Sequence, residues 1–352
     1  MEIKDFLKLT IEKGASDLHL TVNSPPVLRI DGKLVLTNYP ALTGDFLKKS
    51  IYGILTDEQK EKFEKDRELD FSLALESLER FRVNVHIQRG SVEAAMRRIP
   101  LYVPNVKSLG LPPAIFDLSR KPNGLVLITG ITGSGKTTSL AAMINLINEE
   151  RACMITCIED PIEYIHKNKQ SVIKQREVHS DTHSFAEALK RCLRQDPDVI
   201  VIGEMRDIET ISTALTAAET GHLVLATLHT PDAAQTVERI IDVFPSYQQQ
   251  QVRLQLAASI QGVVCQTLLP RADGPGRVLA SEVMMATPAI RNLIREQAIA
   301  QIPTAIQTGM QHGMHTMDSS LKVLYQEGLI TFEDALTQVR NVDEFKQLIG
   351  EE

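Results

Sequence analysis

The sequence predicts an α/β protein whose mostly parallel sheet lies between a small α+β domain and a helical C-terminal region. Three observations predict this order. Apolar strand-like runs alternate with helical segments between residues 122 and 285, which is the pattern of βαβ crossovers. Short strands and amphipathic helices fill the first hundred residues, and beyond Pro288 every segment has helical periodicity.

Length, charge and hydropathy limit the class of protein. The chain of 352 residues exceeds what one core usually organises, so several domains are expected. A net charge of −7 disfavours a broad basic surface, and no nucleic-acid partner is expected. No apolar run approaches the ~18 residues that span a bilayer, so we expect a cytoplasmic protein that reaches a membrane only through partners. The expected segments are an N-terminal domain (1–100), a linker (101–121), a core (122–285) and a helical C-terminal region (286–352).

The individual elements follow from local periodicity and from turn residues. In the N-terminal domain, helices are expected over 2–13, 43–52 and 56–65, and strands over 17–20, 27–30, 81–87 and 91–99. Asp31-Gly32 indicates a hairpin turn after the second strand. In the core, strands are expected over 125–129, 153–158, 171–175, 198–202, 223–227, 263–269 and 277–284. C-terminal helices are expected over 289–296, 297–309, 316–326, 332–339 and 343–348.

Residues 130–137 read Gly-Ile-Thr-Gly-Ser-Gly-Lys-Thr and directly follow an apolar strand, which is the pattern of a phosphate-binding loop. Glycines let the backbone curl so that several N–H groups face phosphate oxygens. Lys136 can reach the β- and γ-phosphates of ATP, and Thr137 can place its hydroxyl on Mg²⁺. The expected nucleotide-binding residues are Gly130, Thr132, Gly133, Ser134, Gly135, Lys136, Thr137 and Thr138.

Two acidic groups follow predicted strands beyond this loop. Glu159, Asp160 and Glu163 come just after the strand at 153–158. Glu204 ends the strand at 198–202 in the manner of a Walker B acid, although Gly203-Glu204 replaces the common Asp-Glu pair. Phosphoryl transfer needs a metal clamp and an oriented water, and both require carboxylates at strand ends. We therefore expect acids from both groups, together with the hydroxyl of Thr137, near the bound nucleotide and its metal.

Two histidines flank the predicted strand at 223–227. His229 follows the strand and could sense the γ-phosphate through a hydrogen bond. His222 precedes the strand, so simple geometry does not let both rings contact one phosphate. Whether His222 has a functional role or only satisfies backbone groups is left open.

The chain resembles a known family, the type II/type IV secretion ATPases, through most of its length. The motifs that carry the resemblance are residues 15–20, 80–84, the phosphate loop, 159–163, 196–198, 203–207, 220–222 and 229–230. The resemblance implies a PAS-like N-terminal domain before a RecA-like ATPase core, assembled as a homohexamer. It also implies that Glu163 acts on the attacking water and that Glu204 supports Mg²⁺.

The same resemblance implies roles for arginines of the N-terminal domain, which reach the nucleotide phosphates in this family. The matching positions are Arg82 and Arg97, whereas the sequence around Arg98 departs from the family pattern. A ring motor needs a cation that arrives only when domains close, because this couples hydrolysis to motion.

Residues 289–296, Ala-Ile-Arg-Asn-Leu-Ile-Arg-Glu, resemble a motif of the family's pilus-retraction motors. The resemblance implies a motor that powers type IV pilus retraction and twitching motility at the inner face of the cytoplasmic membrane. Its implied partner is an inner-membrane pilus platform protein, with other pilus motor ATPases as further candidates. The alternatives are an accessory pilus ATPase or another secretion or DNA-translocating motor, and a nucleotide-dependent binding module without useful turnover.

Overall fold

The computed structural model describes residues 2–350 apart from residues 31, 76–78, 100–108 and 340. The chain divides into two compact units. The first contains residues 1–102 with 163–165, and the second contains residues 103–162 with 166–352. Within the described part of the chain, every helix is too short or too polar to span a lipid bilayer.

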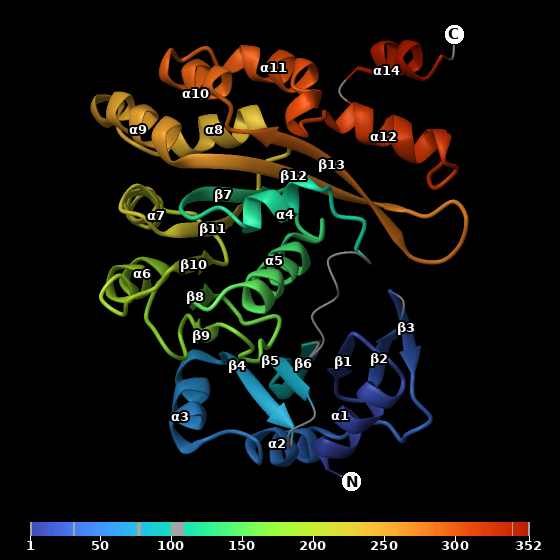
Figure 1. The fold of residues 1–352 in the computed structure, drawn as a ribbon. Coiled ribbons are helices and arrows are strands. Elements are labelled where there is room, and N and C mark those ends of the chain that lie inside the picture. Colours follow the sequence, from blue (N-terminus) through green and yellow to red (C-terminus); the bar gives the residue numbers. More distant parts are fainter. Residues whose placement is uncertain (1, 31, 76–78, 100–108, 340, 351–352) are drawn as a thin grey trace. The chain divides into compact units, whose positions relative to one another are not determined.

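The first unit is an antiparallel sheet covered by helices (Figure 1). Its strands are β1 (Asp17–Leu20), β2 (Val27–Ile30), β3 (Lys33–Leu36), β4 (Glu68–Leu75), β5 (Glu79–Gln88) and β6 (Ser91–Ile99), in the order β3-β2-β1-β6-β5-β4. Its helices are α1 (Ile3–Glu12), α2 (Gly44–Tyr52) and α3 (Asp57–Asp66). Along β5, Phe81, Val83 and Val85 are fully buried while Arg82 between them is exposed, because side chains alternate across a strand.

The elements expected in this unit are present within two residues of their predicted bounds. Asp31 of the predicted turn lies outside the described residues, but Gly32 has φ +80° and β2 pairs with β3 as a hairpin requires. Strand β4 was not predicted. Its signal was the alternation of buried Leu69 and Phe71 with polar residues, which pairs β4 with β5 at the edge of the sheet.

The second unit contains a seven-stranded sheet in the order β13-β12-β7-β11-β10-β8-β9. All pairs are parallel except β12 with β13. The strands are β7 (Gly124–Thr129), β8 (Met154–Glu159), β9 (Val172–Glu177), β10 (Val199–Ile202), β11 (Leu223–Leu228), β12 (Ile260–Pro270) and β13 (Arg277–Met285). The helices are α4 (Ala114–Ser119), α5 (Lys136–Glu150), α6 (Phe185–Cys192), α7 (Ile208–Glu219), α8 (Ala233–Asp242) and α9 (Ser246–Ser259).

Helices cover both faces of this sheet, as a parallel sheet requires. Along β7, Leu125 and Leu127 belong to one buried cluster with residues of α6 to α9. Val126 and Ile128 belong to the opposite cluster, with residues of α4 and α5. Helix α4 lies within the segment that was expected to be a linker, and its residues Ile115 and Leu118 are fully buried in that second cluster.

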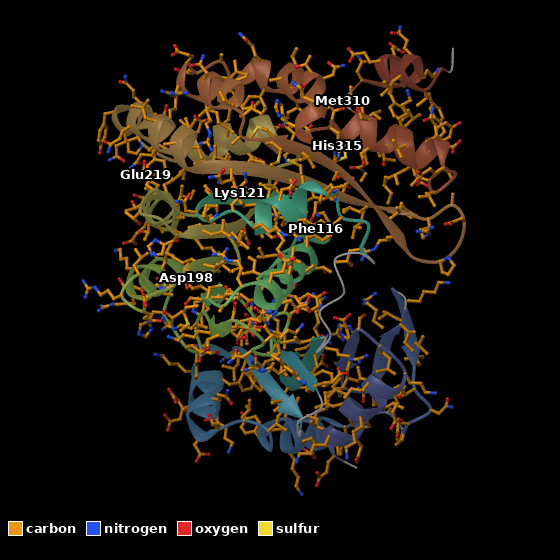
Figure 2. The ribbon with its side chains drawn as sticks, in the orientation of Figure 1. Phe116, Lys121, Asp198, Glu219, Met310 and His315 are labelled. Carbon is orange, nitrogen blue, oxygen red and sulfur yellow. The ribbon has the colours of Figure 1, made fainter. Side chains whose placement is uncertain are left out.

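The C-terminal region is helical, as expected (Figure 1). Its elements are α10 (Pro288–Arg295), η2 (Ile299–Gln301), α11 (Ile302–Thr308), η3 (Met310–His312), α12 (Met317–Gln326), α13 (Phe332–Leu336) and α14 (Val342–Ile349). The single helix predicted over 297–309 is wrong, because α11 begins only at Ile302, with Pro303 in its first turn, and a short 3₁₀ turn precedes it. His315, which Figure 2 labels, fastens this region to β13 through Ser281 Oγ at 3.0 Å.

Candidate nucleotide-binding site

The phosphate loop connects the buried strand β7 to helix α5. Gly130, Gly133 and Gly135 have φ values of +140°, +82° and +89°, which glycine adopts more readily than any other residue. Gly135 is the N-cap of α5, and no side chain caps the helix. The backbone N–H groups of the first helical turn therefore remain available to an anion at the positive end of the helix dipole.

Lys136 lies within this loop. Its Nζ donates to the carbonyl oxygens of Gly130 at 2.7 Å and Ile131 at 3.0 Å. Only 8% of the residue is exposed. Ser134 is also buried, and its Oγ makes no hydrogen bond within the described residues. The loop thus holds a cation and an unpaired hydroxyl at the place where the sequence predicts phosphate.

Sheet order brings the predicted acid and histidine to the same edge. Strand β11 is the parallel neighbour of β7, and β10 is the next strand, so their carboxyl ends lie side by side. His229 follows β11 and Glu204 follows β10. His229 Nδ1 lies 3.4 Å from Lys136 Nζ, and His229 Nε2 lies 3.1 Å from Glu204 Oε1. The imidazole therefore bridges the loop lysine and the strand-end carboxylate.

This arrangement assigns the tautomer of His229. An ammonium group can only donate, so Nδ1 must accept from Lys136. The proton of a neutral ring then sits on Nε2, where it can be donated to the Glu204 carboxylate. The three side chains form one hydrogen-bonded chain in which every bond is donated in the same direction, from Lys136 through His229 to Glu204.

Glu204 is held as a carboxylate. Arg206 donates from Nε to Oε1 at 2.5 Å and from a terminal nitrogen to Oε2 at 2.7 Å. Burial by itself would raise the pKa of Glu204, but the hydrogen bonds from Arg206 and His229 and the positive charge of Arg206 lower it below its usual value. Arg206 was not predicted as a site residue, although its spacing two residues after Glu204 was a usable signal.

Thr227 fixes the backbone on both sides of Glu204. Its Oγ1 donates to the carbonyl oxygen of Gly203 at 2.5 Å, and its own carbonyl oxygen accepts from the amide of Met205 at 3.1 Å. A Cβ atom at Gly203 would lie 3.3 Å from the Cα of Glu159 on β8. A side chain at this position would therefore pack tightly against β8.

The other predicted residues are placed as follows. His222 Nδ1 lies 3.0 Å from the carbonyl oxygen of Ala217, and the ring sits at the opposite end of β11 from His229, so it satisfies a backbone group at the end of α7. Glu163 follows β8 and is exposed. Arg82 and Arg97 belong to the first unit. The catalytic roles given to these last three residues stay predictions.

The two arginines are direct neighbours on the sheet of the first unit. Arg82 of β5 pairs with Arg97 of β6 in register, and Arg97 pairs with Asp17 of β1. Arg97 Nε donates to Asp17 Oδ1 at 2.8 Å, while 70% of the Arg97 side chain stays exposed. Arg98, on the other face, forms an ion pair with Glu79. The carboxylate of Asp17 offsets part of the repulsion expected between two like charges that lie directly opposite each other.

A phosphate loop that follows a central parallel strand, with an acid and a histidine from the neighbouring strand ends, defines a P-loop nucleoside triphosphatase. The family described as "Type II/IV secretion system protein" matches residues 2–337, so the chain belongs to that family. The chain is an ATPase of this family with a RecA-like core.

Particular relatives sharpen this assignment. The chain is 48% identical to "Type IV pilus retractation ATPase PilT" of Pseudomonas aeruginosa, over 98% of this chain and 100% of that protein. It is 47% identical to "Twitching motility protein" of Neisseria gonorrhoeae, over 90% of this chain and 84% of that protein. A solved structure, "Crystal Structure of the Pilus Retraction Motor PilT and Bound ADP", is 47% identical with a TM-score of 0.93, covering 99% of both chains.

Proposed function

We propose that this protein is the ATP-driven motor of type IV pilus retraction. The observation that carries the proposal is similarity to retraction ATPases over essentially the full length of both chains, together with a connected Lys136–His229–Glu204 site. Pilus retraction would then be powered by hydrolysis of ATP to ADP and phosphate.

The chain's own residues fit a nucleotide with Mg²⁺. The buried, unpaired hydroxyl of Ser134 would gain a partner from a phosphate oxygen, and Lys136 would supply a cation. Mg²⁺ prefers hard oxygen ligands, takes few from the protein and shares the rest with phosphates and water. Thr137 and the ionised Glu204 offer such oxygens. When bound, the metal would neutralise charge that develops on the phosphates during transfer.

Each side chain of the site would then have one task. Lys136 would hold the terminal phosphates, and Glu163 would orient the attacking water. His229 lies between Lys136 and Glu204, so any movement of the lysine toward a γ-phosphate changes its hydrogen bond to the histidine. His229 would thereby report the presence of the γ-phosphate to Glu204 and, through it, to Arg206.

Arg82 and Arg97 would supply further positive charge to the nucleotide phosphates. Their support is the adjacent, exposed guanidinium pair on the first unit and the match to the family's motif. The assembly would be a homohexameric ring at the inner face of the cytoplasmic membrane, acting on an inner-membrane pilus platform protein. Work on a membrane-bound fibre requires such a partner.

Helix α10 carries the motif that resembles retraction motors. Ile290 and Ile294 are fully buried. The guanidinium of Arg291 donates to the carbonyl oxygens of Ala257 at 2.6 Å and Ala258 at 2.7 Å, at the end of α9. The motif therefore fastens α10 to α9, and we propose that it transmits movement of the core rather than only offering a surface.

The proposal is tested in the source cell by replacing the native copy with Glu204→Ala. Excess surface pili that never shorten are expected, because assembly continues while retraction stops. Glu238→Ala, an exposed acid on α8, is the matched control and should retract normally. Cells without pili would instead indicate an extension motor, and unchanged pili would indicate another secretion or translocation machine.

A further inference from the structure

We infer that Gln175 and Glu177 of strand β9 are positioning residues that hold the loop carrying Glu163. This inference rests on the proposed role of Glu163 in orienting the attacking water. The loop leaves β8 after Glu159, and the chain re-enters the sheet at Val172. Both side chains contact the backbone of this loop, one on each side of Glu163.

The two contacts are made by alternate residues of one strand. Glu177 Oε2 accepts a hydrogen bond from the amide of Ile162 at 3.1 Å. Gln175 Oε1 accepts from the amide of His166 at 2.9 Å. Residues two apart on a strand project to the same face, so one edge of the sheet binds the chain immediately before and shortly after Glu163.

Gln175 also joins the loop to the strand from which it starts. Its Nε2 donates to Glu159 Oε1 at 2.9 Å, while its Oε1 accepts from His166. An amide side chain offers both a donor and an acceptor, whereas a carboxylate at this position would have no proton for Glu159. Glu159 and Glu177 are 7% and 5% exposed, so water competes little for these bonds.

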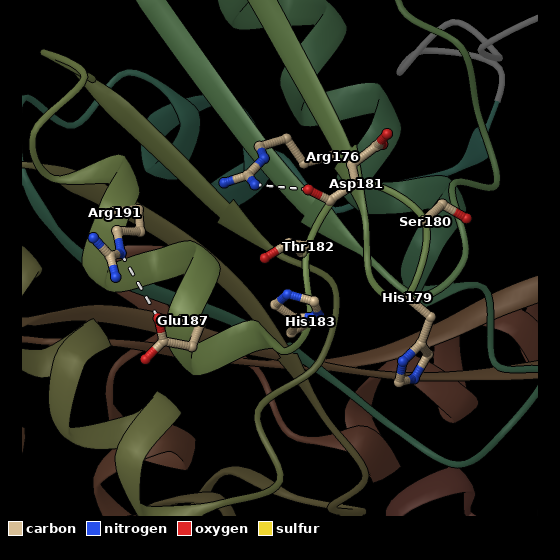
Figure 3. Close-up of a pocket in the computed structure, with 8 residues that line it drawn as sticks. All are labelled: Arg176, His179, Ser180, Asp181, Thr182, His183, Glu187 and Arg191. Atoms are coloured by element: carbon tan, nitrogen blue, oxygen red, sulfur yellow. Dashed lines mark hydrogen bonds and ion pairs between the residues drawn. The ribbon is translucent and has the colours of Figure 1, made fainter.

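Strand β9 lies at the edge of the sheet, but the turn that follows it is firmly tied. The amide of Glu177 donates to Asp181 Oδ2 at 2.8 Å, and the amide of Asp181 donates to the carbonyl oxygen of Glu177 at 2.8 Å. Arg176 donates to the carbonyl oxygen of Asp181 at 2.9 Å, as Figure 3 shows. These hydrogen bonds anchor the end of the strand that carries Gln175 and Glu177, beside an open pocket of about 360 Å³.

The return path of the loop is tied to the phosphate-loop helix as well. Asn148 of α5 is 1% exposed, and its side chain accepts from the amide of Lys169 at 3.0 Å and donates to the carbonyl oxygen of Lys167 at 2.8 Å. The Glu163 loop is thus bound at one end to β9 and further on to the helix that begins at Lys136. Such a frame fixes the place in the loop from which the exposed side chain of Glu163 projects.

The experiment measures ATP turnover in the full-length variants Gln175→Ala, Glu177→Ala and Glu177→Gln and compares it with turnover in the wild type. We expect kcat to fall about 10- to 100-fold in the two alanine variants, because displacing Glu163 by about 1 Å would slow the reaction by a factor of this order. KM for ATP and the Kd for ADP should stay within about twofold of the wild type. Glu177→Gln keeps an oxygen for Ile162 and should retain most activity. Lys174→Ala, an exposed residue next to Gln175 on the same strand, is the control.

A double-mutant cycle with Glu163→Gln distinguishes positioning from a general structural role. If Gln175 acts through Glu163, Gln175→Ala should slow single-turnover hydrolysis in the wild type and have no further effect when Glu163→Gln is present. Additive losses, or loss of ADP binding, would overturn this inference and leave the role of Glu163 intact. A Glu163→Gln variant with full turnover would overturn the proposed role of Glu163 and, with it, this inference.

Discussion

Gly130→Ala tests the geometry of the phosphate loop most directly. Gly130 has φ +140°, and a Cβ atom there would lie 2.3 Å from the carbonyl oxygen of Gln266 and 2.6 Å from Ser134 Oγ. Cβ atoms stay at least 3.0 Å from other heavy atoms, so the loop or β12 would have to move by about 0.7 Å. The serine can rotate, but Gln266 is held in β12 between β7 and β13.

The expected cost follows from two contributions. Forcing an extra carbon into a packed site costs about 1–3 kcal/mol, and a positive φ costs a non-glycine residue about 1 kcal/mol more. Gly130→Ala should therefore lose about 2–4 kcal/mol of unfolding free energy. Gly133→Ala is the matched control, since its φ is +82° but no atom lies within 4 Å of the added carbon, and it should lose only about 1 kcal/mol.

The unfolding free energy is measured by urea unfolding of the nucleotide-free protein. The unfolding transition that belongs to the nucleotide-binding unit is identified as the one that moves to higher urea concentration when ADP is added. Calorimetric titration should also show ADP binding weakened about tenfold in Gly130→Ala, equivalent to one lost bond to a charged phosphate. Equal stability losses in the two alanine variants would refute the steric reasoning, because both variants share the positive φ and differ only in the clash.

Three further predictions concern single side chains. Lys136→Ala should abolish ATP turnover without changing the far-UV circular dichroism, and turnover at the wild-type rate would contradict the site assignment. His229→Ala should lower kcat about 10- to 100-fold in single-turnover assays, since the link between Lys136 and Glu204 is lost; an unchanged kcat would mean that the ring only fills space. Burial and the charge of Lys169 lower the pKa of His166 from 6.5 to about 4. As the pH falls, His166 is therefore protonated in the unfolded chain before it is protonated in the folded protein. The unfolding free energy should fall by about 2 kcal/mol between pH 7 and pH 5. His166→Gln should lack this share of the pH dependence in urea unfolding, and an identical dependence in both proteins would refute the assignment.

Local patterns were sufficient for most elements of the fold. The strand β7, the phosphate loop and the start of α5 were predictable because apolar periodicity, glycine spacing and the lysine act within a few residues of one another. Strand β4 was missed because it is an edge strand with polar residues on one face, which weakens its apolar signal. The helix predicted over 297–309 was wrong because the periodicity of its apolar residues continues across the change from a 3₁₀ turn to α11 at Ile302.

The site was predictable only in part. Glu204 and His229 could be chosen from sequence because each follows an apolar strand, and the carboxyl ends of parallel strands meet at one edge. That the histidine bridges Lys136 and Glu204 depends on β11 lying between β7 and β10. Residues that hold the site through side-chain direction, such as Thr227 and Gln175, were not predicted, because their partners are set by the folded chain.

The sequence by itself determined the nucleotide chemistry of this protein, since a loop of eight residues carries the cation, the hydroxyl and the backbone donors for phosphate. It also determined the family, because several motifs recur in one order along the chain. Only the tertiary structure decided which side chains meet. Lys136 and His229 are 93 residues apart in the chain, and the order of strands brings them within 3.4 Å. Strand order is a property of the whole packed sheet, which local periodicity does not encode.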